Sequence, residues 1–390
     1  SHFKKDYLSF FNEFHIKYKT MKPNTIGRQR LFYFAFISLI LLFCKTKNNE
    51  AANAPFETVT NSEAKDFAKQ LQSSIEKKDA TFFDDAIDKE AFLKKIGLID
   101  NGKDASAFKK GLTDKMKIGT QLINSITKNG TYQLVKQYEK DKIQHLIFRL
   151  YDQGSLNYHD LELGKHDKEV KIDDIYVYTS GELLSETLST LYNQMQSLMQ
   201  SGQVSDEDNW LSIVPQMRQK MRTGDYQGAL RDFRSLPEKI QKLKSLSLML
   251  IMITSGLNDD AAYSAAIDDY QLRFPNEPNM HLILIDGYII KKEYDKAFES
   301  VNKLDEMINK DPFLDYYRYL ISNLKKDNTN AKKYLVSFVN NFPDFEDGIL
   351  ELILTYREDG EKEKADSLIK SYKLHSAFDQ ERLKKELGID

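Results

Sequence analysis

The 390-residue sequence has few of the residues on which disulfide-bonded and turn-rich domains depend. Its single cysteine excludes an intrachain disulfide and any cysteine-clustered zinc or iron–sulfur site. The 17 glycines and 8 prolines are below average usage, which disfavours collagen-like, low-complexity and turn-dense β-sandwich structures. A formal net charge of -3 gives no overall attraction to nucleic acid. With 41% hydrophobic residues most of the chain can bury a core, and at roughly 150 residues per domain we expect about two or three domains.

The first methionine, Met21, begins a stretch that differs from the residues before it. Basic residues at Lys22, Arg28 and Arg30 precede an uncharged apolar run over 31–43. At about 1.5 Å per residue this run reaches about 20 Å, which is short of a hydrocarbon core of about 30 Å. It is therefore predicted to be part of a signal peptide over 21–43 rather than a spanning helix, and residues 1–20 are predicted to be an upstream extension.

The cysteine comes directly after this run, in the sequence Leu41-Leu42-Phe43-Cys44. The arrangement resembles a bacterial lipoprotein signal, in which the cysteine is acylated and becomes the new N-terminus, although Phe43 stands where that family has a small residue. The alternatives are an uncleaved anchor with a buried cysteine, or cleavage after Ala54. The resemblance implies lipid attachment at Cys44 and a place in the bacterial cell envelope, on the periplasmic side or at the outer membrane. Residues 44–62 are polar and predict a tether.

The C-terminal half repeats with a period of about 34 residues, which is typical of helical-hairpin arrays. Ala229, Ala297 and Ala365 lie in similar stretches, each two periods from the next, and Ala331 and Tyr263 occupy the midpoints. Large apolar or aromatic residues recur four and seven residues after this position and twelve before it: Phe233, Ile267, Val301, Leu335 and Ile369; Leu236, Tyr270, Leu304, Phe338 and Tyr372; and Met217, Ile251, Ile285, Tyr319 and Ile353. Such columns predict a helical core rather than a binding site.

This pattern resembles the tetratricopeptide repeat, in which two antiparallel helices occupy roughly 34 residues. The resemblance implies five helical hairpins over 210–379, with the small residue allowing the paired helices to approach closely. Gly224 and Gly360 stand at the turn between helices, where Asn258 and Lys326 stand in the second and fourth repeats. We predict a linker at 201–209 and a charged capping tail at 380–390.

Residues 63–200 have a different period. Apolar residues at helical spacing predict three helices, over 63–77 with Asn61 or Ser62 as the cap, over 81–96 and over 105–127. The period then falls to two, which predicts four antiparallel strands over 131–139, 144–151, 155–163 and 171–179. The apolar residues of the third strand indicate a β-bulge at 159–160. Residues 183–199 predict a further helix.

Helices followed by a curved antiparallel sheet resemble the nuclear-transport-factor-two-like cone of the cystatin-like group. The resemblance depends on the order of elements and on the segments 154–159 and 172–182. Members of that group bind ligands in the cone, catalyse proton transfers there or mediate contacts. The expected fold class is an α+β N-terminal domain of three helices and a four-stranded antiparallel sheet, followed by an all-α helical-repeat solenoid.

Five side chains of the predicted sheet are candidates for general acid–base chemistry: His145, His159, Asp173, Asp174 and Tyr178. His145 alternates against the apolar residues of its strand, so it is expected to face water or a neighbouring helix. Asp173 and Asp174 are adjacent, so one of them must face outward, and His166 is expected in solvent. Phosphate-loop, zinc-protease and nucleophile-elbow motifs do not occur, and the aspartate pairs lack calcium-loop spacing. We therefore predict no catalytic residue, metal, cofactor or nucleic-acid partner.

The inner groove of such a solenoid is lined by the first helix of each pair. Two columns, fifteen and eleven residues before the alanine position, are mostly apolar, and they predict a groove for another protein or a peptide segment. The alternative is that the groove is filled from within. The predicted groove residues are Val214, Leu248, Met252, Leu282, Tyr316, Leu320, Leu350 and Leu354.

These observations predict a lipid-anchored cell-envelope protein that acts as a protein–protein interaction scaffold through its repeats. The alternative is a small-ligand binder or acid–base enzyme in the N-terminal cone, with the repeats as a recruitment module.

Overall fold

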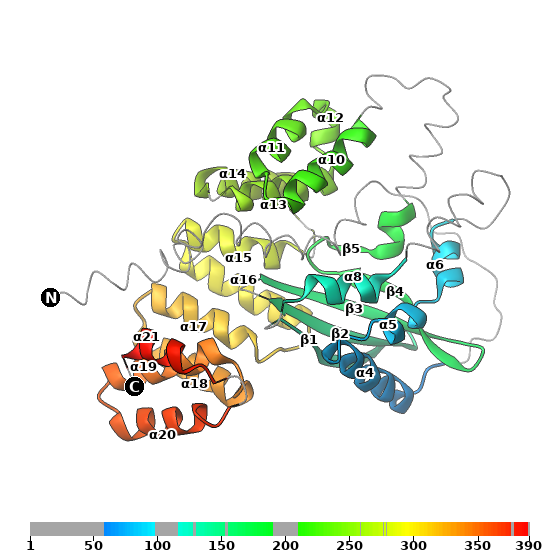
Figure 1. Ribbon diagram of the computed structural model, residues 1–390. Coiled ribbons are helices and arrows are strands. Elements are labelled where there is room, and N and C mark those ends of the chain that lie inside the picture. The colour runs from blue at the N-terminus through cyan, green and yellow to red at the C-terminus, as the bar shows by residue number, and fades with distance from the viewer. Residues whose placement is uncertain are drawn as a thin grey trace. The chain divides into compact units, whose positions relative to one another are not determined.

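The computed structural model describes residues 58–97, 116–127, 130–152, 155–189, 210–257, 259–275, 277, 279–375 and 378–388 (Figure 1). The predictions for residues 1–57, including Cys44, and for the linker at 201–209 lie outside these residues. The chain divides into two compact units between Met280 and His281, and each unit is described by itself.

Helix α4 (Asn61–Glu76) is the first helix described, and a capping box fixes its start. The Thr60 hydroxyl accepts a hydrogen bond from the Glu63 backbone N–H at 3.3 Å, and the Glu63 carboxylate accepts one from the Thr60 backbone N–H at 2.8 Å. The sequence prediction of Asn61 or Ser62 as the cap was therefore wrong, and residues 61–62 belong to the helix rather than to the predicted tether.

The helix predicted over 81–96 is two helices, α5 (Thr81–Ala86) and α6 (Lys89–Lys95). Ile87 is extended and forms a parallel bridge with Ile172 of the sheet, and Asp88 then caps α6 by accepting from the Ala91 N–H at 2.7 Å. A tertiary contact thus interrupts a continuous helical pattern. Helix α8 (Ile118–Ser125) is the described part of the helix predicted over 105–127, so the described residues hold four helices before the sheet instead of three.

The sheet is an antiparallel meander in the order β1 (Thr131–Lys140), β2 (Ile143–Asp152), β3 (Ser155–His166), β4 (Glu169–Val177) and β5 (Glu182–Leu183). The four predicted strands are confirmed, and β5 adds a short fifth. Two-residue turns at Asp141-Lys142 and Asp167-Lys168 connect β1 to β2 and β3 to β4, and all four residues have positive φ. This backbone conformation matches the right-handed twist of the strands it joins.

The two faces of the sheet differ in character. One face packs against α4, α5, α6 and α8 around buried residues such as Phe83, Phe92 and Phe148 (Figure 1). The bulge predicted at 159–160 was wrong, because pairing continues through these residues and the register shifts instead between Glu162 and Leu163. Consequently Leu156 and Tyr158 lie on the face opposite to Leu161 and Leu163. We call this second face, which carries Tyr138, His145, Asp160, Glu162 and Asp174, the polar face.

Residues 210–372 form helical hairpins with a constant spacing. The first helices are α10 (Trp210–Arg222), α13 (Lys244–Gly256), α15 (Met280–Ile290), α17 (Leu314–Leu324) and α19 (Glu346–Glu358). The second helices are α11 (Tyr226–Ser235), α14 (Asp260–Arg273), α16 (Tyr294–Met307), α18 (Asn328–Asn341) and α20 (Lys362–Tyr372). The ends of the first helices and the starts of the second helices each recur with the period of the sequence repeat. A short helix, α12 (Glu238–Gln241), lies between the first two pairs.

Apart from Tyr263 and Ile369, which are half-buried, the residues of the predicted columns are buried in the structure. The alanines of the small-residue column are buried at Ala229, Ala297, Ala331 and Ala365. Between the helices of a pair, the same position has positive φ in four hairpins, at Gly224, Lys292, Lys326 and Gly360. Glycine adopts this conformation without a steric penalty, and lysine does not. The period read from the sequence therefore identified a helical-repeat region correctly.

The unit after Met280 contains a nearly buried ion network. Arg318 of α17 binds Asp305 of α16 at 2.7 Å and Asp315 of its own helix at 2.9 Å. Helix α21 (Gln380–Leu387) contacts α19, and its Leu383 and Leu387 are buried. Among the described helices, none is both long enough and apolar enough to cross a membrane.

Candidate functional site

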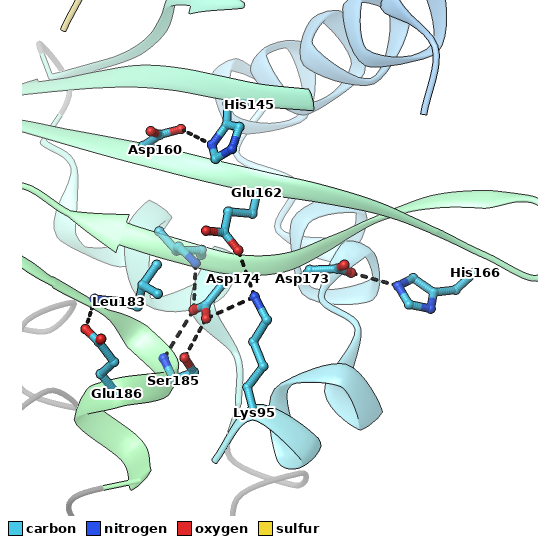
Figure 2. Close-up of polar contacts among 11 residues, drawn as sticks. Lys95, His145, Asp160, Glu162, His166, Asp173, Asp174, Leu183, Ser185 and Glu186 are labelled. Carbon is cyan, nitrogen blue, oxygen red and sulfur yellow. Dashed lines mark hydrogen bonds and ion pairs between the residues drawn. The ribbon is translucent and has the colours of Figure 1, made fainter. Parts of the chain in front are cut away.

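The polar face brings ionisable side chains from four strands into one row. His145 on β2 lies between Tyr138 on β1 and Glu162 on β3, and Glu162 in turn pairs with Asp174 on β4. Asp160 is the next residue of β3 on the same face. Figure 2 shows Lys95, which comes from α6, in contact with Glu162 and Asp174 of this row.

His145 is held by an aspartate and a tyrosine. Its Nδ1 lies 3.2 Å from Asp160 Oδ1 (Figure 2). The Tyr138 hydroxyl donates to Asp160 Oδ2, and the Tyr138 ring stacks on the imidazole with ring centroids 4.7 Å apart. Burial, together with this carboxylate, raises the pKa of Tyr138, so the phenol remains a proton donor. Strand alternation placed His145 on the correct face, but His145 is 7% exposed and its partners are neighbouring strands.

Lys95 neutralises the most deeply buried carboxylate of the cluster. Its ammonium lies 2.7 Å from Glu162 and 3.3 Å from Asp174, whose side chain has no exposed surface. Burial raises the pKa of Asp174, and the charge of Lys95 opposes that effect. Burial disfavours the charged form of Lys95, but Asp174 and Glu162 outweigh it and raise its pKa. Asp174 also accepts hydrogen bonds from the N–H and hydroxyl of Ser185, which ties β4 to the segment after β5.

His166 joins two elements, contrary to the prediction that it lies in solvent. Its Nδ1 is 3.2 Å from Asp88 Oδ2, and its Nε2 is 2.7 Å from Asp173 Oδ1. The register shift beside Glu162 leaves Asp173 without a cross-strand partner and allows this contact. Burial raises the pKa of Asp173, against the opposing effect of His166.

His159 is fully buried on the helix-covered face, with a fixed tautomer. The Asn157 carbonyl oxygen accepts from the backbone N–H groups of Tyr158 and Thr179, so its amide nitrogen must donate to His159 Nε2, 3.1 Å away. The proton of His159 is then on Nδ1 and points at the Tyr132 hydroxyl, 3.2 Å away. Burial lowers the pKa of His159 to about 3, which keeps the ring neutral at physiological pH.

The five sequence candidates therefore do not form one constellation. His145 and Asp174 lie in the polar-face row, Asp173 contacts His166, and His159 is in the core. Tyr178 is buried beside Tyr158, with ring centroids 5.9 Å apart, and burial raises its pKa. The sequence reasoning missed Lys95, Asp160 and Glu162. The sequence did offer a signal for two of them, because Asp160 and Glu162 are two residues apart on one strand and so must lie on the same face.

The predicted groove residues differ in exposure. Met252, Leu282 and Leu354 are half-buried. Tyr316 packs against Phe338 and Phe345, with ring centroids 4.9 and 5.3 Å away. The buried members of the groove set are Val214, Leu248, Tyr316, Leu320 and Leu350.

Comparisons with protein-family models, with curated proteins and with solved structures gave no match. Within the described ranges, no group of three or more histidine, cysteine, aspartate or glutamate side chains is arranged to hold a metal ion.

Proposed function

We propose that the chain is a lipoprotein of the bacterial cell envelope that acts as a protein–protein interaction scaffold through tetratricopeptide repeats. One observation carries this proposal. In each period of the sequence repeat, one helix ends and the next begins at the same two positions. Repeats of this kind contact mainly their neighbours and build extended surfaces, which suit the capture of another chain.

The anchor part of the proposal is supported by the sequence alone. Cys44 follows a basic segment and an apolar run too short to span a bilayer, and a polar tether follows it. Intact mass and acyl labelling of the native protein test this directly. The wild type should carry an acyl group that Cys44→Ala lacks, and an unacylated wild type would remove the anchor from the proposal.

The binding surface is assigned to the part of the groove set that remains accessible. Leu282 of α15 and Leu354 of α19 are half-buried and belong to first helices of the unit after Met280. An apolar surface on such helices suits an amphipathic helix or an extended apolar segment of a partner. The other five residues of the groove set are buried, and we assign them to packing rather than to binding.

Crosslinking in the native envelope, followed by mass spectrometry, tests the scaffold. Leu282→Glu combined with Leu354→Glu should abolish the principal crosslink while the helical circular dichroism and the melting temperature stay close to wild type. Leu374→Glu is the matched control, because Leu374 is 87% exposed and lies outside the groove set. An unchanged crosslink in a folded double variant would refute this groove.

The second candidate function is acid–base or small-ligand chemistry in the N-terminal domain, favoured by the contact between His145 and Asp160. An ionised carboxylate only accepts hydrogen bonds, so Asp160 would hold the proton on Nδ1 and leave Nε2 as a base. Native mass spectrometry distinguishes this candidate. A copurifying small molecule that His145→Gln loses would favour it, whereas no bound mass on either protein, or bound mass that the variant keeps, would oppose it.

A further inference from the structure

Three ionisable side chains meet where α6 approaches the β3–β4 hairpin. Asp88 stands at the N-cap of α6, His166 ends β3, and Asp173 is the residue that the register shift leaves unpaired on β4. Gly164 makes the room for Asp173, because a Cβ at that position would lie 2.2 Å from Asp173 Oδ2. The absence of a side chain at Gly164 therefore allows the Asp173 carboxylate to lie close to the backbone of β3. Figure 2 shows His166 and Asp173 in contact.

The two contacts of His166 require one proton more than a neutral imidazole carries. Each ring nitrogen faces a carboxylate oxygen, at 3.2 Å for Asp88 and 2.7 Å for Asp173. A neutral ring has one N–H and one lone pair, so one of its nitrogens would direct a lone pair at a carboxylate. Both contacts are satisfied together only when the ring is doubly protonated or when one carboxyl group keeps its proton. Burial raises the pKa of Asp173, which favours retention of the proton within this group.

Three cations near His166 (Lys95, Lys165 and Lys171) each pair with another carboxylate. The charged groups near His166 come from four elements. Asp88 caps α6 and Lys95 lies in it, and Glu63 of α4 pairs with Lys165, which precedes His166 on β3. The groups on β4 are Asp173, Glu169 and Lys171. Lys171 pairs with Glu169 at 2.8 Å, and Lys165 pairs with Glu63 at 2.9 Å. Lys95 acts on Asp173 but contacts Glu162 and Asp174. Loss of the proton therefore leaves two carboxylates around one neutral ring.

These contacts hold a helix that carries a central residue of the polar face. Asp88 caps α6 through the Ala91 N–H, and its own backbone N–H donates to the Ile172 carbonyl at 3.0 Å. Helix α6 in turn positions Lys95 against Glu162 and Asp174. We propose that Asp88, His166 and Asp173 form a proton-dependent clamp, which fastens α6 to the β3–β4 hairpin when the extra proton is bound and releases it when the proton leaves.

The sign of the effect follows from the proton count. The clamp is closed while the extra proton is bound, and the stabilisation that it gives to α6 is lost as the pH rises and that proton leaves. The proposal concerns the N-terminal domain and does not depend on the scaffold function.

Amide hydrogen exchange of residues 89–95 in the full chain tests the clamp, after correction for the intrinsic pH dependence of exchange. Between about pH 5 and about pH 8 the wild-type protection factors should fall about tenfold, the scale of one lost hydrogen bond to a charged group. His166→Gln removes the charge, so protection should be low and independent of pH. Asp173→Asn should give high protection at both values, because the new amide donates to Nε2 while neutral His166 donates from Nδ1 to Asp88.

The control is His375→Gln, a half-buried histidine of the other unit, which should keep the wild-type fall in protection. Wild-type protection that does not change with pH would overturn the clamp. A wild-type fall that persists in His166→Gln or in Asp173→Asn would overturn it as well. If His166→Gln does not fold, Asp173→Asn, which preserves side-chain size, still decides the question.

Discussion

Arg318 and Asp305 lie 2.7 Å apart on consecutive helices, with 11% and 7% of their side chains exposed. Arg318→Met should leave buried Asp305 with only the exposed Lys310, 3.5 Å away, as a cation, and reduce the free energy of unfolding by about 2 kcal/mol in urea titration. Lys325 and Asp295 form the matched control, because Asp295 is 89% exposed, and Lys325→Met should cost less than about 1 kcal/mol. Equal losses for both variants would contradict a special role for Arg318.

The turn position inside each hairpin gives a second prediction. Lys326 adopts a φ of 61°, which lysine tolerates poorly, and Gly360 adopts 75° at the equivalent position. Lys326→Gly should therefore raise the free energy of unfolding by up to about 1 kcal/mol, and Gly360→Ala should lower it by about the same amount. Thermal unfolding of both variants checks the pair, and a change of the same sign in the two would be inconsistent with the turn geometry.

The buried neutral His159 predicts how stability depends on pH. Its folded-state pKa is about 3 and its unfolded-state value is 6.5, so below about pH 6.5 the unfolded chain binds a proton that the folded chain does not. The contribution is fully present above pH 6.5 and declines by about 1.4 kcal/mol per pH unit as the pH falls towards 3. His159→Gln should flatten this part of a stability–pH curve measured by urea unfolding. A curve with the wild-type slope would show that another group is responsible.

The pairing of Lys95 with Asp174 gives a fourth prediction. Lys95→Met leaves a buried carboxylate without its cation, and we expect a loss of about 2 kcal/mol at pH 7. The loss should shrink towards pH 4, because Asp174, whose pKa burial already raises, can then take up a proton. Exposed Lys94 is the neighbouring control, and Lys94→Met should have little effect at either pH. A loss that does not depend on pH would argue against an uncompensated Asp174.

The sequence predicted the features that follow from local periodicity. The repeat period located the helical pairs, and alternation located the four main strands and the face of His145. The break at Ile87 was not predictable in this way, because it depends on a bridge to Ile172, which lies far away in the sequence. The capping box was missed although Thr60 stands three residues before Glu63, which is its usual spacing.

The arrangement of the candidate site depended on strand register. A two-residue turn at Asp141-Lys142 places Tyr138 opposite His145, but Asp-Lys is not a common sequence for such a turn. Without that turn, the stacking of Tyr138 on His145 could not be derived. The position of the bulge at Asp173 decided whether His166 met a carboxylate, and nothing in the local pattern of β4 specifies it.

The hairpins keep their spacing even though their turns do not keep their residues. Glycine stands at Gly224 and Gly360, and lysine at Lys292 and Lys326, yet the second helix always begins two residues later. Removing one residue from such a turn would rotate the second helix by about 100° and direct its buried alanine away from its partner helix. Duplication of one complete repeat would instead give each hairpin a neighbour of the kind it already has. During evolution, therefore, this region could change its length by gaining or losing whole hairpins far more readily than by single residues.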